Sequence, residues 1–211
     1  MPPAWHSGGV FILASASPSR RRLLEQAGVV PVIIVSGVDE DAVVEAQGDP
    51  SPADIASLLA RAKAAAVAAL PQAQEALVLA CDSVFDFDGQ AMGKPGTADI
   101  ARARWEAMRG RSGVLRTGHC LIDTATGRQA QELVSTTVTM GDADDDEIDD
   151  YIASGEPLQV AGGFTLDGRG APFIARIDGD PGNVIGVSLP AVRRLARALG
   201  HPWPSLVRPQ A

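Results

Sequence analysis

The sequence predicts an α/β protein with a mixed central β-sheet flanked by helices. Segments rich in Val and Ile alternate with longer segments of helical periodicity, the pattern of a sheet covered by helices. Hydrophobic residues make up 45% of the 211 residues but aromatic residues only 4%, so the core must be aliphatic. A chain of this length buries roughly 70% of its unfolded surface and needs no disulfide or metal ion to stabilise its core. We therefore expect one domain over residues 1–211, with loose ends at about 1–9 and 200–211.

The expected strands are short apolar runs, rich in β-branched residues and bounded by turn residues. They lie at 10–14, 31–35, 76–87, 114–123, 129–140, 164–166 and 173–177. The run at 76–87 ends at Asp88-Gly89, a dipeptide favoured in two-residue hairpin turns. The runs at 114–123 and 129–140 flank a turn, so we expect them to pair.

Helices are predicted where capping residues precede apolar residues at 3.6-residue spacing. Their expected bounds are 19–27, 51–70, 97–108, 147–153 and 190–199. The second of these has a clear start, because Ser51 is followed by Pro52 at the first position and Asp54 in the first turn. The acidic run before 147–153 lacks the central glycine of a calcium loop, so we interpret it as a capped helix start.

The charge balance limits the classes of partner. The net charge is −8, and an acidic chain repels polyanions, so no stable complex with nucleic acid is expected. No apolar run approaches the ~20 residues of a membrane span, and residues 1–9 lack the features of a signal sequence. Cys81 and Cys120 lie far apart without C-x-x-C spacing, which predicts neither zinc nor a disulfide. We expect a soluble cytoplasmic protein with no membrane partner.

The end of the first predicted strand is a candidate anion site. Its sequence, ASASPSRRR from Ala14, places hydroxyl groups and cations at a strand-to-helix junction. A helix start offers free N–H groups and a positive dipole end, and arginine adds bidentate donors. The candidate substrate-binding residues here are Ser15, Ser17, Arg20 and Arg21. A serine N-cap followed by solvated arginines explains the same residues equally well.

Two acidic positions are candidates for metal binding or proton transfer. Asp82 lies inside the most apolar stretch of the chain, where an unpaired carboxylate is costly. Such a group can bind a metal, or accept a proton if its pKa rises. Glu40 belongs to an acidic group after a strand, which suits Mg²⁺ held together with substrate phosphates. The alternatives are a plain acidic loop for Glu40 and an exposed edge-strand acid for Asp82.

Two lysines and one further acid complete the candidates. Lys63 lies among alanines on the predicted helix at 51–70, where a lone lysine more often only increases the solubility of the protein. Lys94 stands directly before Pro95 and can make a rigid phosphate contact, although the stretch before it is one residue short of a P-loop. Asp167 lies in a glycine-dense stretch and can accept hydrogen bonds from a base edge.

Taken in order, these segments resemble those of the Maf (septum formation) nucleoside triphosphate pyrophosphatases. The resemblance extends from Phe11 to about Leu199, nearly the whole chain. It is carried by LASASP, VDE, LARAKA, CDSV, GKP, GRSGVLRTG, GEP, AGGFTLDG and NVIG, which begin at Leu13, Val38, Leu59, Cys81, Gly93, Gly110, Gly155, Ala161 and Asn183. Each motif is weak alone, whereas so many in this order are specific.

The resemblance implies a Maf/ITPase-like fold with a cleft between two lobes. It also implies a cytoplasmic homodimer that uses Mg²⁺ or Mn²⁺ to split a nucleoside triphosphate into a monophosphate and pyrophosphate, linked to nucleotide house-cleaning and cell-division arrest. The matching functional positions are Ser15, Arg20, Glu40, Lys63, Asp82 and Lys94. By this resemblance the three cations neutralise the triphosphate, the two acids hold the metal, and Asp82 is the proposed proton acceptor. Ser83, in the CDSV motif, joins the substrate-binding residues.

The chain departs from the family at positions tied to the base. The branch that prefers dTTP and UTP has Arg, Thr and Gln where this chain has Ser19, Ser83 and Asp167. The branch linked to 7-methyl-GTP is similar in having an acid at the last of these positions, but it has Trp and Gln at the first two positions. The family's Glu before the helical lysine is Ala62 here. Base preference therefore stays open, and a nucleotide-binding regulator of cell division that does not hydrolyse its ligand is the alternative function.

Overall fold

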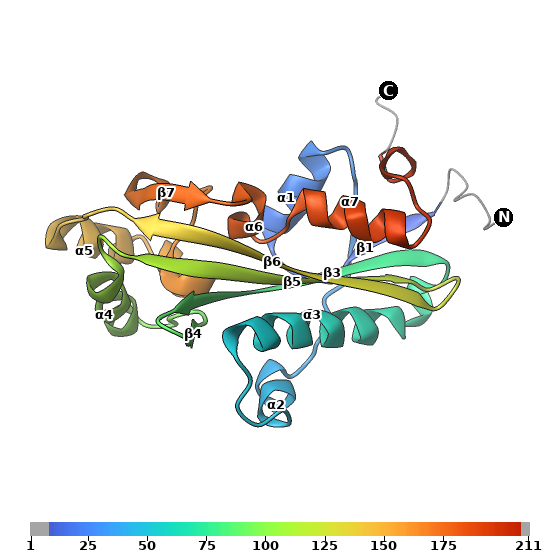
Figure 1. The fold of residues 1–211 in the computed structure, drawn as a ribbon, viewed down its shortest axis with the longest axis horizontal. Helices are drawn as coiled ribbons and strands as arrows, with labels where there is room; N and C mark the ends of the chain where they lie inside the picture. Colours follow the sequence, from blue (N-terminus) through green and yellow to red (C-terminus); the bar gives the residue numbers. More distant parts are fainter. Residues whose placement is uncertain (1–8, 208–211) are drawn as a thin grey trace.

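The computed structural model describes residues 9–207, and a seven-stranded mixed sheet forms its centre (Figure 1). The strands are β1 (Val10–Leu13), β2 (Val32–Ile33), β3 (Ala76–Phe87), β4 (Gln90–Met92), β5 (Ser112–Asp123), β6 (Arg128–Met140) and β7 (Ile174–Asp178). Their order is β2-β1-β3-β5-β6-β7, and β4 pairs with β3 outside this path. The pairs of β1 with β2 and β3 are parallel, and all other pairs are antiparallel. The predicted α/β class with a mixed sheet is confirmed.

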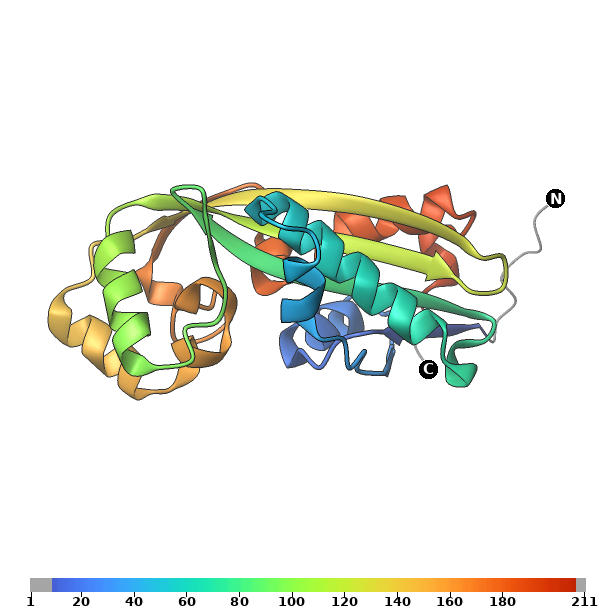
Figure 2. The ribbon, with the colours of Figure 1, turned by 90° about the horizontal axis from the view of Figure 1, so that it is seen from below.

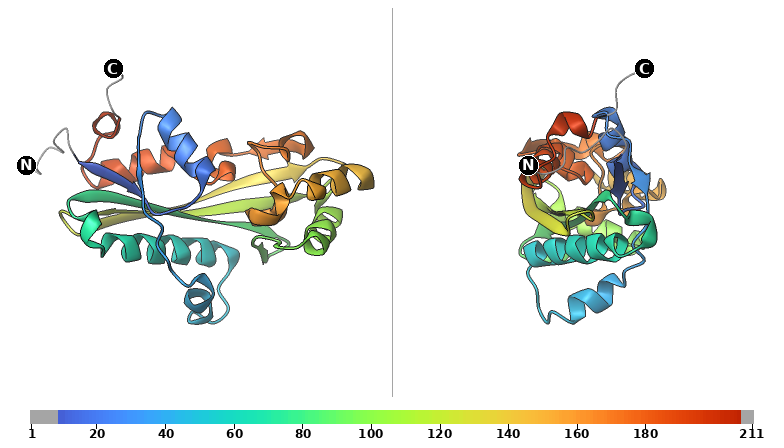
Figure 3. Two further views of the ribbon diagram at one scale, coloured as in Figure 1. Left: turned by 180° about the vertical axis from the view of Figure 1, so that it is seen from behind. Right: turned by 90° about the vertical axis from the view of Figure 1, so that its right-hand side faces the viewer.

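Helices cover both faces of the sheet. On one face lie α1 (Pro18–Gln26), α6 (Pro181–Ile185) and α7 (Leu189–Ala198), as Figures 1 and 3 show. The long helix α3 (Pro52–Ala68) lies along the opposite face, with α2 (Glu40–Glu45) on its outer side. At one end of the sheet, α4 (Ala98–Met108) and α5 (Asp145–Ala153) form a separate group (Figure 2). Short 3₁₀ helices lie at Pro71–Ala73, Glu156–Gln159, Ala161–Gly163, Ala171–Phe173 and Trp203–Ser205.

Separate apolar clusters stabilise two lobes. In the larger lobe, Leu24 of α1 and Val192 of α7 are buried on one face of the sheet, and Ala60 of α3 is buried on the other. In the smaller lobe, Trp105 of α4 is buried against α5, and Phe85 of β3 belongs to the same cluster. The strands β3, β5 and β6 run through both lobes (Figure 2). The cleft between the lobes stays a prediction.

Capping fixes two of the predicted helix starts. In α3, the Ser51 hydroxyl accepts a hydrogen bond from the backbone N–H of Asp54, and the Asp54 carboxylate accepts one from the N–H of Ser51. In α5, Asp144 and Glu147 form the same reciprocal arrangement. The acidic run before α5 is therefore a capped helix start, as the sequence predicts. Within residues 9–207, no helix is long and apolar enough to cross a membrane.

Two local predictions are wrong. Residues 164–166 form no strand, because Gly162 and Gly163 turn the backbone at positive φ and Phe164 packs edge-on against Phe85, 5.0 Å between ring centroids. The segment from residue 200 was expected to be loose, yet His201 and Leu206 are buried. Residues 1–8 and 208–211, the remainder of the expected loose ends, lie outside the described residues.

Three differences concern the extent of elements. The strand predicted at 31–35 is reduced to Val32–Ile33. No helix is predicted at α2, which has no buried residue, or at the five-residue α6. Both short helices matter for the site, because α2 carries Glu40 and α6 leads into Gly186.

Candidate active site

The candidate site surrounds a gap in the sheet beside β3. On this edge β1 pairs only with Ala76–Leu79, and β4 pairs only with Phe85–Phe87. Between them, residues 80–84 have no strand partner on this edge among residues 9–207. The Leu79 carbonyl accepts from Ala14 N–H on this side. Because hydrogen-bonding direction alternates along a strand, the backbone N–H groups of residues 81 and 83 face the gap.

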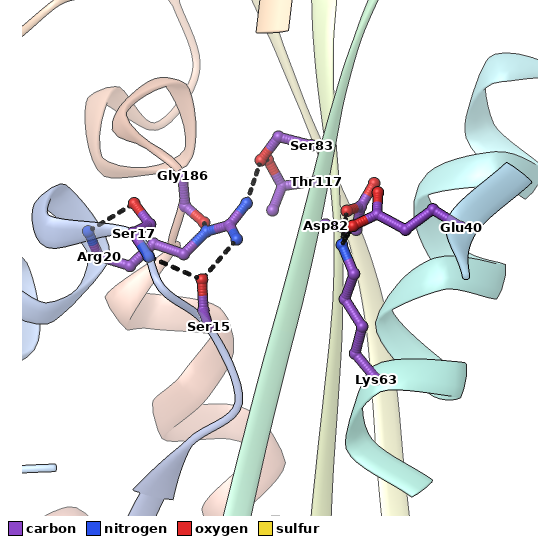
Figure 4. A network of polar contacts seen from close by, with 9 residues as sticks. All are labelled: Ser15, Ser17, Arg20, Glu40, Lys63, Asp82, Ser83, Thr117 and Gly186. Carbon is purple, nitrogen blue, oxygen red and sulfur yellow. Dashed lines mark hydrogen bonds and ion pairs between the residues drawn. The ribbon is translucent and has the colours of Figure 1, made fainter. Parts of the chain in front are cut away.

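Arg20 is oriented at this gap by three hydrogen bonds (Figure 4). Its Nε donates to the carbonyl of Gly186 at 2.7 Å, Nη1 donates to Ser15 Oγ at 3.1 Å, and Nη2 donates to Ser83 Oγ at 3.0 Å. Two of the five guanidinium N–H groups remain to bind an anion. Ser17 is the N-cap of α1, since its hydroxyl accepts from Arg20 N–H. The segment is therefore both a capped helix start and a site with an oriented arginine.

The two hydroxyl groups beside Arg20 differ in what they can donate. Ser15 Oγ accepts from Ser17 N–H at 3.2 Å and from Arg20 Nη1, so its own O–H remains available. Ser83 Oγ lies 3.0 Å from Thr117 Oγ1. Ser15 is thus the hydroxyl with a proton to offer a phosphate.

The Ser83 proton is already engaged. Thr117 donates its own O–H to the backbone carbonyl of Asn183 at 3.2 Å, so it can only accept from Ser83. The bonds therefore run in one direction, from Arg20 through Ser83 and Thr117 to Asn183. Ser83 supports Arg20 and has no second proton for a ligand.

A lysine and two carboxylates lie on the other side of β3 (Figure 4). Asp82 and Ser83 are consecutive strand residues and project to opposite faces. Lys63 Nζ of α3 lies 2.5 Å from Asp82 Oδ1 and 2.8 Å from Glu40 Oε1. The side chains of Asp82 and Lys63 are 11% and 12% exposed, whereas that of Glu40 is 52% exposed. Burial raises the pKa of Asp82 above its usual value, and the Lys63 ammonium opposes that rise.

A glycine brings Lys63 to Asp82. Gly118 of β5 lies opposite Asp82 in the ladder, on the face that α3 covers. A Cβ at Gly118 would lie 2.2 Å from the carbonyl oxygen of Ala56 in α3. The missing side chain therefore allows the helix to approach the sheet closely enough for Lys63 to contact Asp82.

Glu40 and Asp82 fit a divalent cation that is completed by a ligand. Among residues 9–207 no group of three or more His, Cys, Asp and Glu side chains could hold a metal by itself. Mg²⁺ commonly takes one or two carboxylates together with waters and substrate phosphates. The two oxygen donors gathered at Lys63 suit that mode of binding.

The remaining sequence-predicted residues lie outside this network. Arg21 is exposed and pairs with Glu25 of its own helix at 2.7 Å. Lys94 is exposed on the segment after β4 and has no ion-pair partner within the described part of the chain. Asp167 pairs with Arg22 of α1, which joins the 164–170 loop to the larger lobe.

The site includes residues to which the sequence assigned no role. Thr117 lies in the GRSGVLRTG motif, and Asn183 and Gly186 lie in NVIG, so the motifs marked their segments without indicating the contacts. Each contact joins residues more than 30 positions apart, which local patterns cannot show.

The fold is that of an α/β protein, and an oriented arginine and a buried lysine–carboxylate pair lie on opposite sides of an open strand edge, an arrangement that suits an anionic ligand. The chain belongs to the Maf-like protein family, whose model matches residues 10–199. The resemblance inferred from the sequence is thereby confirmed.

Relatives named nucleoside triphosphate pyrophosphatase match over most of their length. The relative from Streptomyces coelicolor is 60% identical over 190 residues, 90% of each chain. The relative from Salinispora tropica is 53% identical over 91% of this chain and 84% of its own. The relative from Mycobacterium sp. (strain JLS) is 50% identical over 92% of this chain and 96% of its own.

Proposed function

We propose that this protein is a nucleoside triphosphate pyrophosphatase, a hydrolase that converts a nucleoside triphosphate and water into a monophosphate and pyrophosphate. The observation that carries the proposal is the arrangement of Arg20 and the Lys63–Asp82 pair on either side of the open edge of β3. The names of relatives at 50–60% identity support the same activity. The non-hydrolytic alternative is disfavoured, because the relatives at this identity are named for hydrolysis of the nucleotide.

The binding groups are donors concentrated at one place in an acidic chain. Arg20 offers two free N–H groups, Ser15 offers one O–H, and the open edge of β3 offers the backbone N–H groups of residues 81 and 83. Lys94, exposed and unpaired among residues 9–207, is the further cation proposed to reach the phosphates. The net charge of −8 then excludes longer polyanions while these groups accept one triphosphate.

Asp82 is the proposed proton acceptor. Its raised pKa makes it a stronger base than an exposed carboxylate, and the Lys63 ammonium at 2.5 Å stabilises its ionised form. The oxygen of a water molecule attacks phosphorus, the bridging P–O bond between the α- and β-phosphoryl groups breaks, and pyrophosphate leaves with the bond electrons. The water proton passes to Asp82. Arg20 and Lys63 offset the charge that develops on the phosphoryl oxygens.

Glu40 and Asp82 are the residues proposed to hold Mg²⁺ or Mn²⁺. When bound, such an ion neutralises phosphate charge and polarises the phosphoryl oxygens. Lys63 contacts both carboxylates and so limits their mutual repulsion before substrate arrives.

A matched pair of substitutions tests the role of Asp82. Asp82→Asn is expected to lower kcat by about 10²–10⁴-fold, the usual contribution of a general base. Asp86→Asn is the control, because Asp86 lies on the same strand and pairs with Arg116 at 2.8 Å. Hydrolysis of a nucleotide panel with pyrophosphate detection measures both. Undiminished activity of Asp82→Asn would remove the assigned role.

We further propose a cytoplasmic homodimer that meets at the edge strand β2. Val30, Val32, Ile33 and Val35 are exposed there, up to 61%, and residues 27–38 contain no charged side chain. Two copies of an acidic chain can meet at such an edge without burying like charges, and one two-fold axis pairs the same strand with itself.

The oligomeric state tests the proposed interface. Ile33→Lys is expected to give monomers in sedimentation equilibrium, and Leu133→Lys is the control, since both side chains are 37% exposed. A dimer that survives Ile33→Lys contradicts this surface. The wider role, removal of unwanted nucleotides linked to cell-division arrest, follows from the family resemblance and is part of the same proposal.

A further inference from the structure

We propose that His119 is a positioning residue that holds Arg20 in place through the turn at residues 182–188. The inference rests on the proposed function, in which Arg20 binds the triphosphate. His119 lies on β5, which pairs with the edge of β3 opposite the gap, so it would act only through other residues.

The turn at 182–188 supplies the carbonyl that orients Arg20. Gly186 O accepts from Arg20 Nε at 2.7 Å, the shortest of the three bonds to this guanidinium. Gly186 has a φ of 127°, and a Cβ there would lie 3.0 Å from Arg20 Nε. The arginine therefore lies directly against the turn, and a displacement of the turn displaces the guanidinium.

The turn is attached to the sheet on both sides of Gly186. Before it, Asn183 Nδ2 donates to Leu115 O at 3.1 Å and to Thr136 Oγ1 at 3.1 Å. After it, Ser188 N–H donates to His119 Nε2 at 2.9 Å. The first attachment uses β5 and β6, and the second uses β5 alone.

Both ring nitrogens of His119 are engaged inside the protein. Ser188 N–H can only donate, so Nε2 carries no proton, and Nδ1–H donates to Thr117 O at 3.0 Å. The side chain is 1% exposed. Burial, reinforced by the charge of Arg20, lowers the pKa of His119 to about 4, so the ring is neutral at neutral pH. A neutral, fully bonded ring has no proton to exchange with substrate and is suited to a fixed attachment.

Two substitutions of His119 separate its two bonds. His119→Gln places an amide oxygen near the position of Nε2 and can accept from Ser188, whereas His119→Asn retains only a donor near Nδ1. We expect His119→Asn to lower kcat/KM by about 10–100-fold, mainly through a higher KM, because small misplacements of binding groups are costly. We expect His119→Gln to stay within about threefold of the wild type. Equal losses in the two variants would overturn the proposal.

A double-mutant cycle tests whether the effect passes through Arg20. Arg20→Lys keeps a cation but cannot make three hydrogen bonds at once. In that background His119→Asn is expected to change kcat/KM by less than about twofold. The same 10–100-fold loss in both backgrounds would show that His119 acts independently of Arg20 and would overturn the proposal.

A second pair of substitutions, at Ser188, removes the donor of the bond to His119. Ser188→Pro deletes the donated N–H at a residue whose φ of −83° proline can approach, and Ser188→Ala deletes only the hydroxyl that caps α7. We expect Ser188→Pro to raise KM about tenfold over Ser188→Ala. Matching KM values would contradict the proposal even where His119→Asn fails to fold.

The failure of this inference is distinguishable from that of the proposed function. A wild-type protein that hydrolyses no nucleoside triphosphate refutes the function. The coupling of His119 to Arg20 is then read from calorimetric binding of inorganic pyrophosphate to the same four proteins of the cycle. Additive effects in that binding would overturn the inference by itself.

Discussion

Gly118→Ala tests whether the close approach of α3 to the sheet builds the Lys63–Asp82 pair. The added Cβ would lie 2.2 Å from the carbonyl oxygen of Ala56, whereas ordinary contacts begin at 3.4 Å. The helix must therefore retreat by roughly 1.2 Å, the difference between these two distances. The obstruction is helix backbone and not a flexible side chain, so rotamer changes cannot relieve it.

The expected cost follows from overpacking. Inserting a methyl group into a packed core costs about 1–3 kcal/mol, and we expect Gly118→Ala near the upper end of this range. The same retreat moves Lys63 away from Asp82, so kcat/KM should fall by about 10–100-fold. Urea unfolding measures the free-energy change, and pyrophosphate release measures the activity.

Gly141→Ala is the matched control. Its Cβ would meet Phe173 O at 3.3 Å, which a shift of a few tenths of an ångström relieves, and it lies in the smaller lobe. We expect a loss below about 1 kcal/mol and unchanged activity. The reasoning is refuted if Gly118→Ala is as stable as this control, or if it is destabilised by 1–3 kcal/mol with full activity.

Three further predictions concern single groups. Ser15→Ala is expected to lower kcat/KM about tenfold, because it deletes one donor to phosphate and one of the three bonds that orient Arg20; wild-type kinetics would contradict the role. Lys94→Met is expected to raise KM without lowering the melting temperature, since Lys94 is exposed, and a KM equal to that of the wild type at low salt would count against it. Glu156→Gln is expected to lower the melting temperature at pH 7. Burial acts to raise the pKa of Glu156, but hydrogen bonds led by that of Thr165 outweigh it and lower the pKa. The ionised Glu156 therefore stabilises the fold above the ordinary pKa of 4.5, and this stabilisation is lost as the pH falls below it. A melting difference that is independent of pH would refute this reading.

Local signals were sufficient for most of the fold. Capping residues located α3 and α4 to within one or two residues at their starts, because Ser51 and Thr97 make bonds three positions away. The hairpin at Asp88-Gly89 formed as predicted, since the turn dipeptide sets the register of Phe87 against Gln90. Each of these interactions depends on only a few consecutive residues.

Long-range contacts could not be read in the same way. The strand predicted at 164–166 is absent because Gly162 and Gly163 turn the backbone at positive φ and Phe164 packs against Phe85 of the distant strand β3. Asp39 caps α2 through Ala42 N–H, so the acidic loop expected around Glu40 is a helix start. Only the second case depends on a local bond, in which the N-cap aspartate accepts from a backbone N–H of its own helix.

In the candidate site, too, local patterns indicated single residues but not the contacts between distant residues. The buried position of Asp82 was readable from its apolar neighbours, but its pairing with Lys63 depends on α3 crossing β5 at Gly118. The bond between His119 and Ser188 spans 69 positions and left no mark in composition or periodicity. Sequence patterns therefore identified the groups with unusual chemistry and missed the ones that hold them in place.

The most direct test of the account is product analysis of nucleoside triphosphate hydrolysis by the wild-type protein with Mg²⁺ or Mn²⁺. A panel of standard and modified bases should include at least one substrate that yields monophosphate and pyrophosphate in equal amounts. The proposed cleavage between the α- and β-phosphoryl groups predicts this stoichiometry. Release of a nucleoside diphosphate and inorganic phosphate would contradict it. Tight nucleotide binding with no product from any member of the panel would contradict it as well.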